Sequence, residues 1–402
     1  MKTRRTAVSS TIFAVGVILA LIVAGAGGYF YGTSAAPAAP STVTVVSTVA
    51  GAGGTQTVTA SAGNAAPQLS VLAQDAAAAQ KECGSQTTCL TVYSTVDPGD
   101  WAADMAPNFY QEFPWANGKV NWVGPSAAQV TSMMITECQA NKIVGDMTVV
   151  TLGIVYPVIN AGCILDYNSP MAPLANETTS NGGADPNGAW YVSFISVPVI
   201  QYNPQQLASL NLPTPKSWSD LGNPVYKGHI GFQTATSLSA TTGIFYYLYQ
   251  QMGNSSWTSL MNAIAANQPV ITSSASATTS NILSGKLALG VGLYNDYLSA
   301  HAANASSMGY VAPAPNVYNP GVSAIAKGTS HPAFAKLMTD WLMSNMGAQG
   351  YAETARLPSN AAVGSIFGLA PPGSTLVNSY TNTGIFSNPA QWSTIFKNIF
   401  GR

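Results

Sequence analysis

The sequence predicts an α/β fold with a parallel sheet, and two observations support this prediction. Short apolar strands alternate with segments able to form helices over residues 90–152, an order typical of a parallel sheet covered by helices. The chain has 402 residues, of which 47% are hydrophobic, so it is long enough to bury the cores of two domains.

Three strands and two helices are expected in this first part. The strands are LTVYS (90–94), KVNWV (119–123) and GDMTVVTL (145–152), and the helices cover 101–113 and 127–142, the second with Ser126 as its N-cap. Ligands of such sheets bind beyond the carboxyl ends of the strands. One rim should therefore carry the residues that follow the first two strands: Ser94, Thr95, Asp97, Gly124, Pro125 and Ser126.

The second half of the chain contains a hydroxyl-rich segment. Apolar strands over 191–202, a helix-like run over 244–252 and a helix over 332–346 are also expected there. Seven of the nine residues from Thr272 to Ser280 carry hydroxyls, and the apolar run LALGVGL follows. Hydroxyls and free N–H groups at the start of a helix can hold a polar or anionic ligand. The alternative is that these residues only cap a helix.

Charged residues are scarce. They make up 7% of the chain, and the net charge is -1. Nucleic-acid binding is excluded because it needs a basic face. A surface with few carboxylates changes little in charge as the pH falls, which would suit a protein that faces acid.

The N-terminal residues 1–32 predict a signal peptide or a membrane anchor. Lys2, Arg4 and Arg5 precede about twenty apolar residues, a length that crosses a bilayer, and place the rest of the chain outside the cytoplasm. Cleavage near Ser34 and retention of the segment both remain open. Residues 33–68 are poor in charge and complexity, which predicts a stalk.

The four cysteines predict two disulfide bonds, since an even count is typical of exported proteins. Of the three possible pairings, Cys83 with Cys89 and Cys138 with Cys163 gives the shortest loops and is preferred. Glycosylation sequons occur at Asn176, Asn254 and Asn304.

Several segments, in order, resemble the extracellular solute-binding proteins of ABC importers, in the two-lobed group that includes ferric-iron, polyamine, thiamine and phosphonate binders. They are LTVYSTVDP, PVIQYNP, PKSWSDLGNPVYKGHIGF, SSASATTSNILSGKLALGVGLYND, SAIAKGTSHPAFAKLMTDWLMSN and GYAETARLPSN, and they span about Leu90 to Asn360. The segment with Trp218 and Lys227-Gly228 is the most specific. An anchor with a stalk indicates an archaeal type of this family.

The resemblance implies a two-lobed, type II periplasmic-binding-protein fold in which each lobe has a mainly parallel sheet. Residues 90–199 and 311–402 would form lobe one, and residues 200–310 lobe two. It further implies a monomer that carries a small molecule or ion to a membrane permease on the outer face of the cell membrane. No cofactor and no chemistry on the solute are expected.

The same resemblance places four clusters of side chains and the end of the GVGL strand in one cleft. These ligand-binding candidates are Ser94, Thr95, Asp97, Ser126, Thr236, Ser237, Ser239, Ser273, Ser274, Ser276, Tyr294, Asn295 and Asp296. Asp97 and Asp296 suit a cation or the amines of a polyamine, although an aspartate at such a position can also cap a turn. Tyr294 and Tyr297 suit ferric iron, but the adjacent tyrosine pair of the ferric-binding relatives is absent there.

The solute stays open among ferric iron, a polyamine, a phosphonate or other oxyanion, and a sugar. Trp101, Trp115 and Trp122 could stack on a sugar ring, but core or interface packing is favoured for each of them. A secreted acid serine peptidase that uses Ser237 is the enzyme alternative, because TATSLSATT resembles a nucleophile segment. It lacks the glycine and proline of that motif and a histidine segment for the base. A surface-layer protein would explain the stalk but not the ordered motifs.

Overall fold

The computed structural model describes residues 42–47, 56–61, 65–175, 183–234, 239–360, 370–371, 376–379 and 389–401. The chain divides into two compact units, residues 1–70 and 71–402. In the first unit, β1 (Thr42–Ser47) pairs antiparallel with β2 (Gln56–Ser61). The predicted stalk thus contains a strand pair, because TVTVVS and QTVTAS are rich in β-branched residues. The predicted anchor, residues 1–32, lies outside the described residues.

The first lobe is built on an eight-stranded sheet in the order β14-β7-β13-β5-β3-β4, with β6 and β15 also paired to β13. Its strands are β3 (Leu90–Ser94), β4 (Val120–Val123), β5 (Met147–Thr151), β6 (Ile164–Leu165), β7 (Tyr191–Ser196), β13 (Asn316–Ala326), β14 (Leu357–Pro358) and β15 (Leu376–Asn378). As predicted, β3 lies parallel to β4 and β5. The sheet is mixed rather than mainly parallel, because β13 returns from the second lobe antiparallel to β5 and β7.

Helices pack on this sheet in the layers typical of an α/β lobe. They are α1 (Ala65–Cys83), α2 (Pro98–Asp100), α3 (Ala106–Glu112), α4 (Ala127–Gln139), α5 (Leu152–Asn160), α6 (Ala172–Ala175), α11 (Pro332–Met343) and α12 (Asn345–Glu353). The helix predicted over 101–113 is divided into a π-helical turn, Trp101–Met105, and α3. Trp101 stacks on Trp122 with 4.4 Å between the ring centroids, so both rings belong to the core.

The second lobe is built on a five-stranded sheet in the order β10-β9-β11-β8-β12. Its elements are β8 (Pro198–Tyr202), α7 (Pro204–Ser209), β9 (Ile230–Gln233), α8 (Gly243–Ala266), β10 (Val270–Thr272), α9 (Ala275–Leu283), β11 (Leu289–Leu293), α10 (Tyr294–Ala303) and β12 (Gly309–Val311). β9 is parallel to β10 and β11, whereas β8 is antiparallel to β11 and β12. Trp218, in the most specific segment of the family resemblance, is buried in this lobe.

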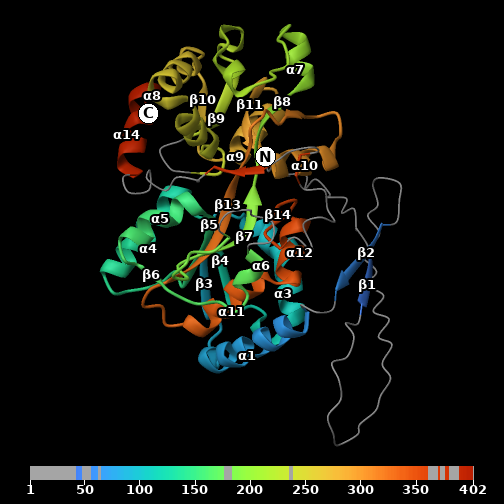
Figure 1. Ribbon diagram of the computed structural model, residues 1–402, viewed down its shortest axis with the longest axis vertical. Helices are drawn as coiled ribbons and strands as arrows, with labels where there is room; N and C mark the ends of the chain where they lie inside the picture. The colour runs from blue at the N-terminus through green and yellow to red at the C-terminus, as the bar shows by residue number, and fades with distance from the viewer. Residues whose placement is uncertain are drawn as a thin grey trace, which may run out of the picture. The chain divides into compact units, whose positions relative to one another are not determined.

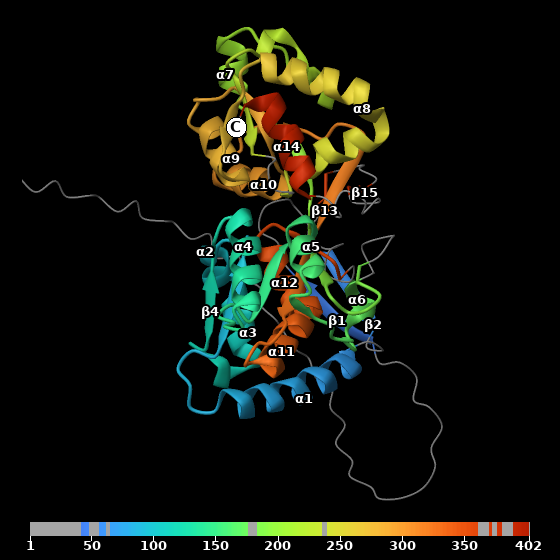
Figure 2. The same ribbon diagram turned by 90° about the vertical axis from the view of Figure 1, so that its left-hand side faces the viewer.

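Two strand connections join the lobes: β7 continues into β8, and β12 leads into the long strand β13. In Figure 2, β13 runs between the second lobe and the first. Helix α14 (Pro389–Phe400) was expected in lobe one but packs on α8 of the second lobe (Figure 1). The physical reason is aromatic burial: Trp392 lies against Tyr246, with 5.5 Å between centroids, and Phe396 lies 6.0 Å from Phe245. The other limits of the lobes remain predictions.

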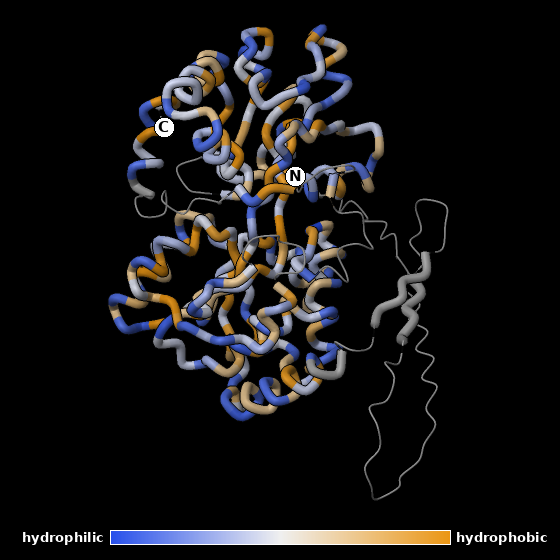
Figure 3. The backbone as a smooth tube through the Cα atoms, viewed as in Figure 1, coloured by the Kyte–Doolittle hydropathy of each residue, from blue (hydrophilic) through white to orange (hydrophobic). Residues whose placement is uncertain are grey.

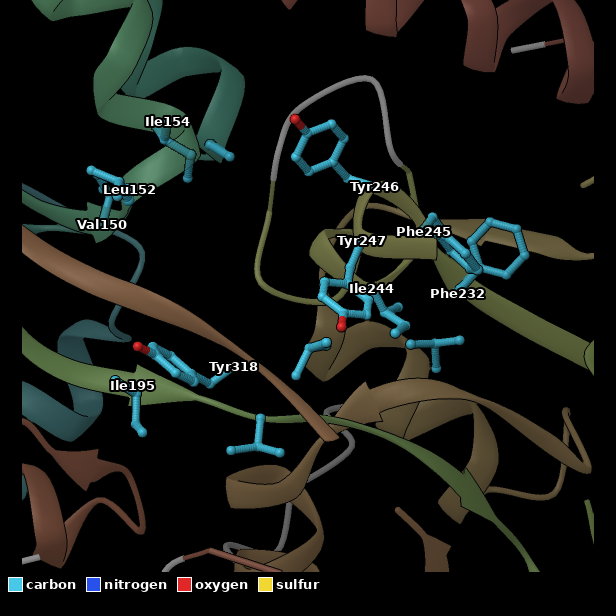
Figure 4. Packing of buried hydrophobic residues seen from close by; sticks show 14 of the residues in the cluster. Val150, Leu152, Ile154, Ile195, Phe232, Ile244, Phe245, Tyr246, Tyr247 and Tyr318 are labelled. Carbon is cyan, nitrogen blue, oxygen red and sulfur yellow. The ribbon is translucent and has the colours of Figure 1, made fainter. Parts of the chain in front are cut away.

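The largest core cluster extends along strands of both lobes, and a second cluster packs within the first lobe; hydrophobic residues concentrate on these strands (Figure 3). Tyr246 and Tyr247 belong to it, as expected for residues inside an apolar helix (Figure 4). The disulfide bonds are Cys83–Cys89 and Cys138–Cys163, the pairing with the shortest loops. No helix among the described residues is long and apolar enough to cross a membrane.

Candidate functional site

A cleft of about 720 Å³ lies at the carboxyl ends of strands from both lobes. Residues that end or follow β3, β4 and β5 line it from the first lobe, and residues that end or follow β9, β10 and β11 line it from the second. This is the position at which open α/β sheets bind ligands. In Figure 2, α9 and α10 of the second lobe face the first lobe.

The first-lobe rim is lined by the predicted residues. Ser94, Thr95, Asp97, Gly124, Pro125 and Ser126 all contribute to the cleft wall. Ser94 is fully buried; its hydroxyl donates to the Val149 carbonyl (2.8 Å) and accepts from the Val96 N–H (2.9 Å), so it shapes the loop. Asp97 accepts from the Gly99 N–H (2.7 Å) and thereby caps α2.

Ser126 forms a capping box with Gln129 at the start of α4, as its predicted N-cap role requires. Its backbone N–H and its hydroxyl both lie within 2.9 Å of the Gln129 Oε1 atom. The side chain therefore does two things at once: it starts the helix and it presents a polar edge to the cleft.

The hydroxyl-rich segment, residues 272–280, both caps a helix and lines the cleft. Ser273, Ser274 and Ser276 line the cleft at the start of α9. Ser274 is the N-cap of that helix, and its hydroxyl accepts from the Ala277 N–H (3.1 Å). Thr272 and Thr278 are buried and bond to each other through their hydroxyls (2.6 Å), which holds the turn in place.

The remaining second-lobe candidates divide into three groups. Ser239, Asn295 and Asp296 line the cleft. Thr236 and Ser237 lie outside the described residues. Tyr294 is not among the cleft-lining residues: it is buried in a ring cluster, 5.7 Å from Tyr297 and 5.1 Å from Tyr310 between centroids, and burial raises its pKa. Its position as the first residue of α10 turns its ring back against β12.

Asp296 is the cleft carboxyl with the most distinctive environment. Burial raises its pKa to about 6, while the nearby Arg356 charge and hydrogen bonds from Thr279 and Asn295 act in the opposite direction. The Asn295 amide donates to Oδ1 (2.9 Å), and the Thr279 hydroxyl lies 3.4 Å from Oδ2. Thr279 also donates to Gln201 of β8 (2.8 Å), which fixes the carboxyl to the second sheet.

Sequence reasoning missed a charged group on the first lobe. Arg356 lines the cleft and its Nη1 atom lies 2.7 Å from Asp100 Oδ2, an ion pair between residues 256 positions apart. Asp104 and Glu353 line the cleft beside them, and burial raises the pKa of both carboxyls. The available signal was the spacing of Asp100 and Asp104 by four residues, which places two rare carboxylates on one face of a helix.

Aromatic rings and metal ligands contribute little to the cleft. Phe194 is the one aromatic ring among its described lining residues, so no tryptophan there can stack on a sugar. The described residues contain no group of three or more His, Cys, Asp or Glu placed to hold a metal ion. No histidine lines the described cleft wall, and Ser237 lies outside the described residues.

A model of the family described as bacterial extracellular solute-binding protein matches residues 147–367. Iron-bound HitA from Pseudomonas aeruginosa shares the fold, with a TM-score of 0.62, 15% identity and coverage of 78% of this chain and 99% of that one. So does AfuA from Actinobacillus pleuropneumoniae, a periplasmic binding protein with fructose-6-phosphate bound, with a TM-score of 0.62, 18% identity and coverage of 79% and 97%.

Apo ferric ion-binding protein A from Pasteurella haemolytica has a TM-score of 0.61, 17% identity and coverage of 77% of this chain and 97% of its own. A search of curated protein sequences finds no match. The neighbours and the family are solute-binding proteins, not enzymes. The family model matches more than half of the chain, and the fold has two α/β lobes with a polar cleft at the ends of their strands. The chain therefore belongs to the bacterial extracellular solute-binding proteins and is the solute-binding component of an ABC transporter.

Proposed function

We propose that the cleft binds a small organic solute that carries positive charge, such as an amine, and delivers it unchanged to a membrane permease. The observation that supports this is the distribution of charge. The chain has 15 acidic residues, and five of them, Asp97, Asp100, Asp104, Asp296 and Glu353, line this one cleft. Arg356 is the single basic residue among the described lining residues, and Asp100 already pairs with it.

The competing feature is the pair of helix N-termini at the cleft, those of α4 and α9. Each is equivalent to about half a positive charge and attracts anions. Ser126 and Ser274 already cap these ends with their own oxygens. Five carboxyl groups, even with some of them partly protonated, outweigh two capped helix ends, so the cleft favours a cation.

The other solutes fit less well. HitA binds iron and AfuA binds fructose-6-phosphate, so the shared fold alone does not select a solute. No tyrosine lines the described part of the cleft, and its carboxylates are not clustered for a metal ion. A solute with amines separated by several carbons matches carboxyls that sit on both lobes, Asp296 on one and Asp104 on the other.

Delivery requires that the lobes move. The two connections between the lobes would let a solute stabilise a closed form by its higher affinity for that form. We propose that the protein works as a monomer, held at the outer face of the membrane by residues 1–32. The charge pattern of that segment supports this arrangement.

A thermal-shift series with matched compounds tests the solute class. The full-length protein is mixed at about pH 7.5 with a linear diamine, with the diol of the same length and with the corresponding dicarboxylate; ferric citrate and a phosphonate complete the set. A ligand at a hundred times its Kd adds about 2.7 kcal/mol of stability. We expect a clear rise in Tm with the diamine, little with the diol and none with the dicarboxylate.

A rise with the dicarboxylate or the phosphonate, and none with the diamine, would contradict the proposed charge preference. It would instead assign the ligand to the helix ends of α4 and α9. Mass spectrometry of the denatured protein shows whether a solute retained from purification hides the response.

A further inference from the structure

A carboxyl group is buried at the base of the first lobe, and it is not among the cleft-lining residues. Asp340, in α11, is completely buried. The Tyr167 hydroxyl donates to its Oδ2 atom (2.7 Å), and the Ser169 hydroxyl donates to Oδ1. Both donors come from the loop that precedes α6, so that side of the carboxyl is filled by neutral groups.

The other side of Asp340 faces a second carboxyl, that of Asp75 in α1, within reach of a side-chain hydrogen bond. The Asp75 Oδ2 atom is buried, and no donor among the described residues bonds to it. Two ionised carboxylates in contact repel each other, whereas one shared proton turns the same contact into a hydrogen bond. The geometry therefore calls for a proton between the two side chains.

No cation among the described residues forms an ion pair with either of these two carboxyls. The ion pairs among the described residues are His331–Asp146 and Arg356–Asp100. The other ionisable groups around it are Tyr167, Tyr191 and Lys336, with Asp185 near Tyr191. Lys336 places its Nζ atom over the Tyr167 ring, 5.1 Å from the centroid, and the Tyr191 hydroxyl donates to the Tyr167 carbonyl. Burial raises the pKa of both tyrosines, so they stay neutral.

Helix α1 is attached differently at its two ends. At its C-terminal end Cys83 is bonded to Cys89, and the Glu82 carboxylate accepts from the Ala333 and Phe334 N–H groups of α11, both at 3.0 Å. Further toward the N-terminus, α1 is held by packing, with Leu72 and Ala79 buried and Val71 and Ala76 packed against the core, and by the Asp75 side chain. A change at Asp75 therefore acts on the end that has no covalent tether.

We propose that Asp75 and Asp340 form a proton-sharing latch that fastens α1 to the first lobe in acid and loosens the helix as the proton is lost. The sign follows from linkage. Burial raises the pKa of Asp340 to about 7, above its ordinary value, so its contribution to stability is complete in acid and is lost as the pH rises through neutrality. Figures 1 and 2 show α1 running along the base of the first lobe, near α11.

Hydrogen exchange of the full-length protein at about pH 5 and about pH 8, corrected for the intrinsic pH dependence, tests the latch. We expect peptides within residues 71–79 to exchange faster at the higher pH, and peptides around the Cys83–Cys89 bond to keep their protection. Asp340→Asn should abolish the difference, because its amide does not titrate between these pH values and can donate to Asp75, although its single oxygen keeps only one of the hydrogen bonds from Tyr167 and Ser169. Asp75→Asn should do the same from the other side.

The exposed Asp166 provides the matched control, since Asp166→Asn removes one negative charge from the same lobe without touching the pair. It should keep the pH dependence of the unmodified protein. Equal protection of residues 71–79 at both pH values would overturn the proposal. If Asp340→Asn or Asp75→Asn folds and its hydrogen exchange still depends on pH, the proposal is overturned as well. No solute is used, so the result is independent of the proposed ligand.

Discussion

Asp296 in the cleft and Asp340 beneath the first lobe are two carboxyls with the same perturbation and different surroundings. Burial raises the pKa of the first to about 6 and of the second to about 7, and each accepts two side-chain hydrogen bonds. Asp296 lines an open cleft and feels the Arg356 charge; Asp340 is sealed and faces another carboxyl. A raised pKa thus indicates only that the carboxyl is buried. The groups that face the carboxyl decide whether it can bind a solute or hold two helices together.

Exchanging each aspartate for asparagine gives the largest expected effect. Asp296→Asn should weaken the binding of an amine by about tenfold to a hundredfold, because a hydrogen bond to a charged group contributes about 1.5–3 kcal/mol. Asp340→Asn lies away from the cleft and should leave the affinity unchanged. Titration calorimetry with the amine found by thermal shift measures both. An equal loss of affinity in the two variants would contradict the different roles assigned to Asp296 and Asp340.

The disulfide near α1 comes next. Cys83→Ser with Cys89→Ser should lower the free energy of unfolding by about 2 kcal/mol, the cost expected for opening so short a loop. Denaturant unfolding measures this loss. Affinity for the amine should not change, since neither cysteine lines the cleft. A matching loss of affinity would mean that the base of the lobe and the cleft are coupled.

The pH dependence of binding separates the two carboxyls further. A cationic solute needs the ionised form of Asp296, so its Kd should rise by up to about tenfold per pH unit as the pH falls below about 6. Asp104 and Glu353, whose pKa values burial also raises, add to this trend. Calorimetry from about pH 8 to about pH 5 tests it, with Asp296→Asn expected to flatten the curve. Affinity that stays constant over this range would argue for a neutral solute.

Arg356 offers the smallest and most specific test. Its charge lowers the pKa of Asp296 and of Asp104, so Arg356→Gln should move the midpoint of the pH dependence upward and strengthen amine binding a few-fold at neutral pH. The exposed Lys227→Gln removes the same charge elsewhere and serves as the control. An unchanged midpoint in the arginine variant would remove this residue from the site.

Much of the fold was predictable because local signals were strong. The strand at residues 90–94 matches β3, and Ser126 caps α4 as its position before an amphipathic run indicates. The rim formed by Ser94, Thr95, Asp97 and Ser126 followed from a rule about parallel strands that needs only strand order. The division of the chain into lobes was harder to predict, because the aromatic packing of α14 on α8 joins residues that are far apart in the sequence.

Sequence reasoning placed several hydroxyls, Asp97, Asn295 and Asp296 along the cleft wall, and it missed Asp100, Asp104, Glu353 and Arg356. Tyr294 follows the same strand as Asp296 and carries plausible ligand chemistry, yet its ring turns into a cluster with Tyr297 and Tyr310. A helix rotates neighbouring side chains by about 100° per residue, so adjacent residues at its start face different surroundings. Sequence alone does not say which of them faces the cleft.

By itself the sequence indicated the α/β class, a resemblance to the family, a preferred but not unique disulfide pairing and a rim of hydroxyls and Asp97 at strand ends. These depend on local order and spacing along the chain. Tertiary structure decided the charge of the cleft, because Asp100 and Arg356 meet across 256 positions. It also decided the pairing of Asp75 with Asp340. Coulomb interactions depend on distance in space, and only packing brings such residues together.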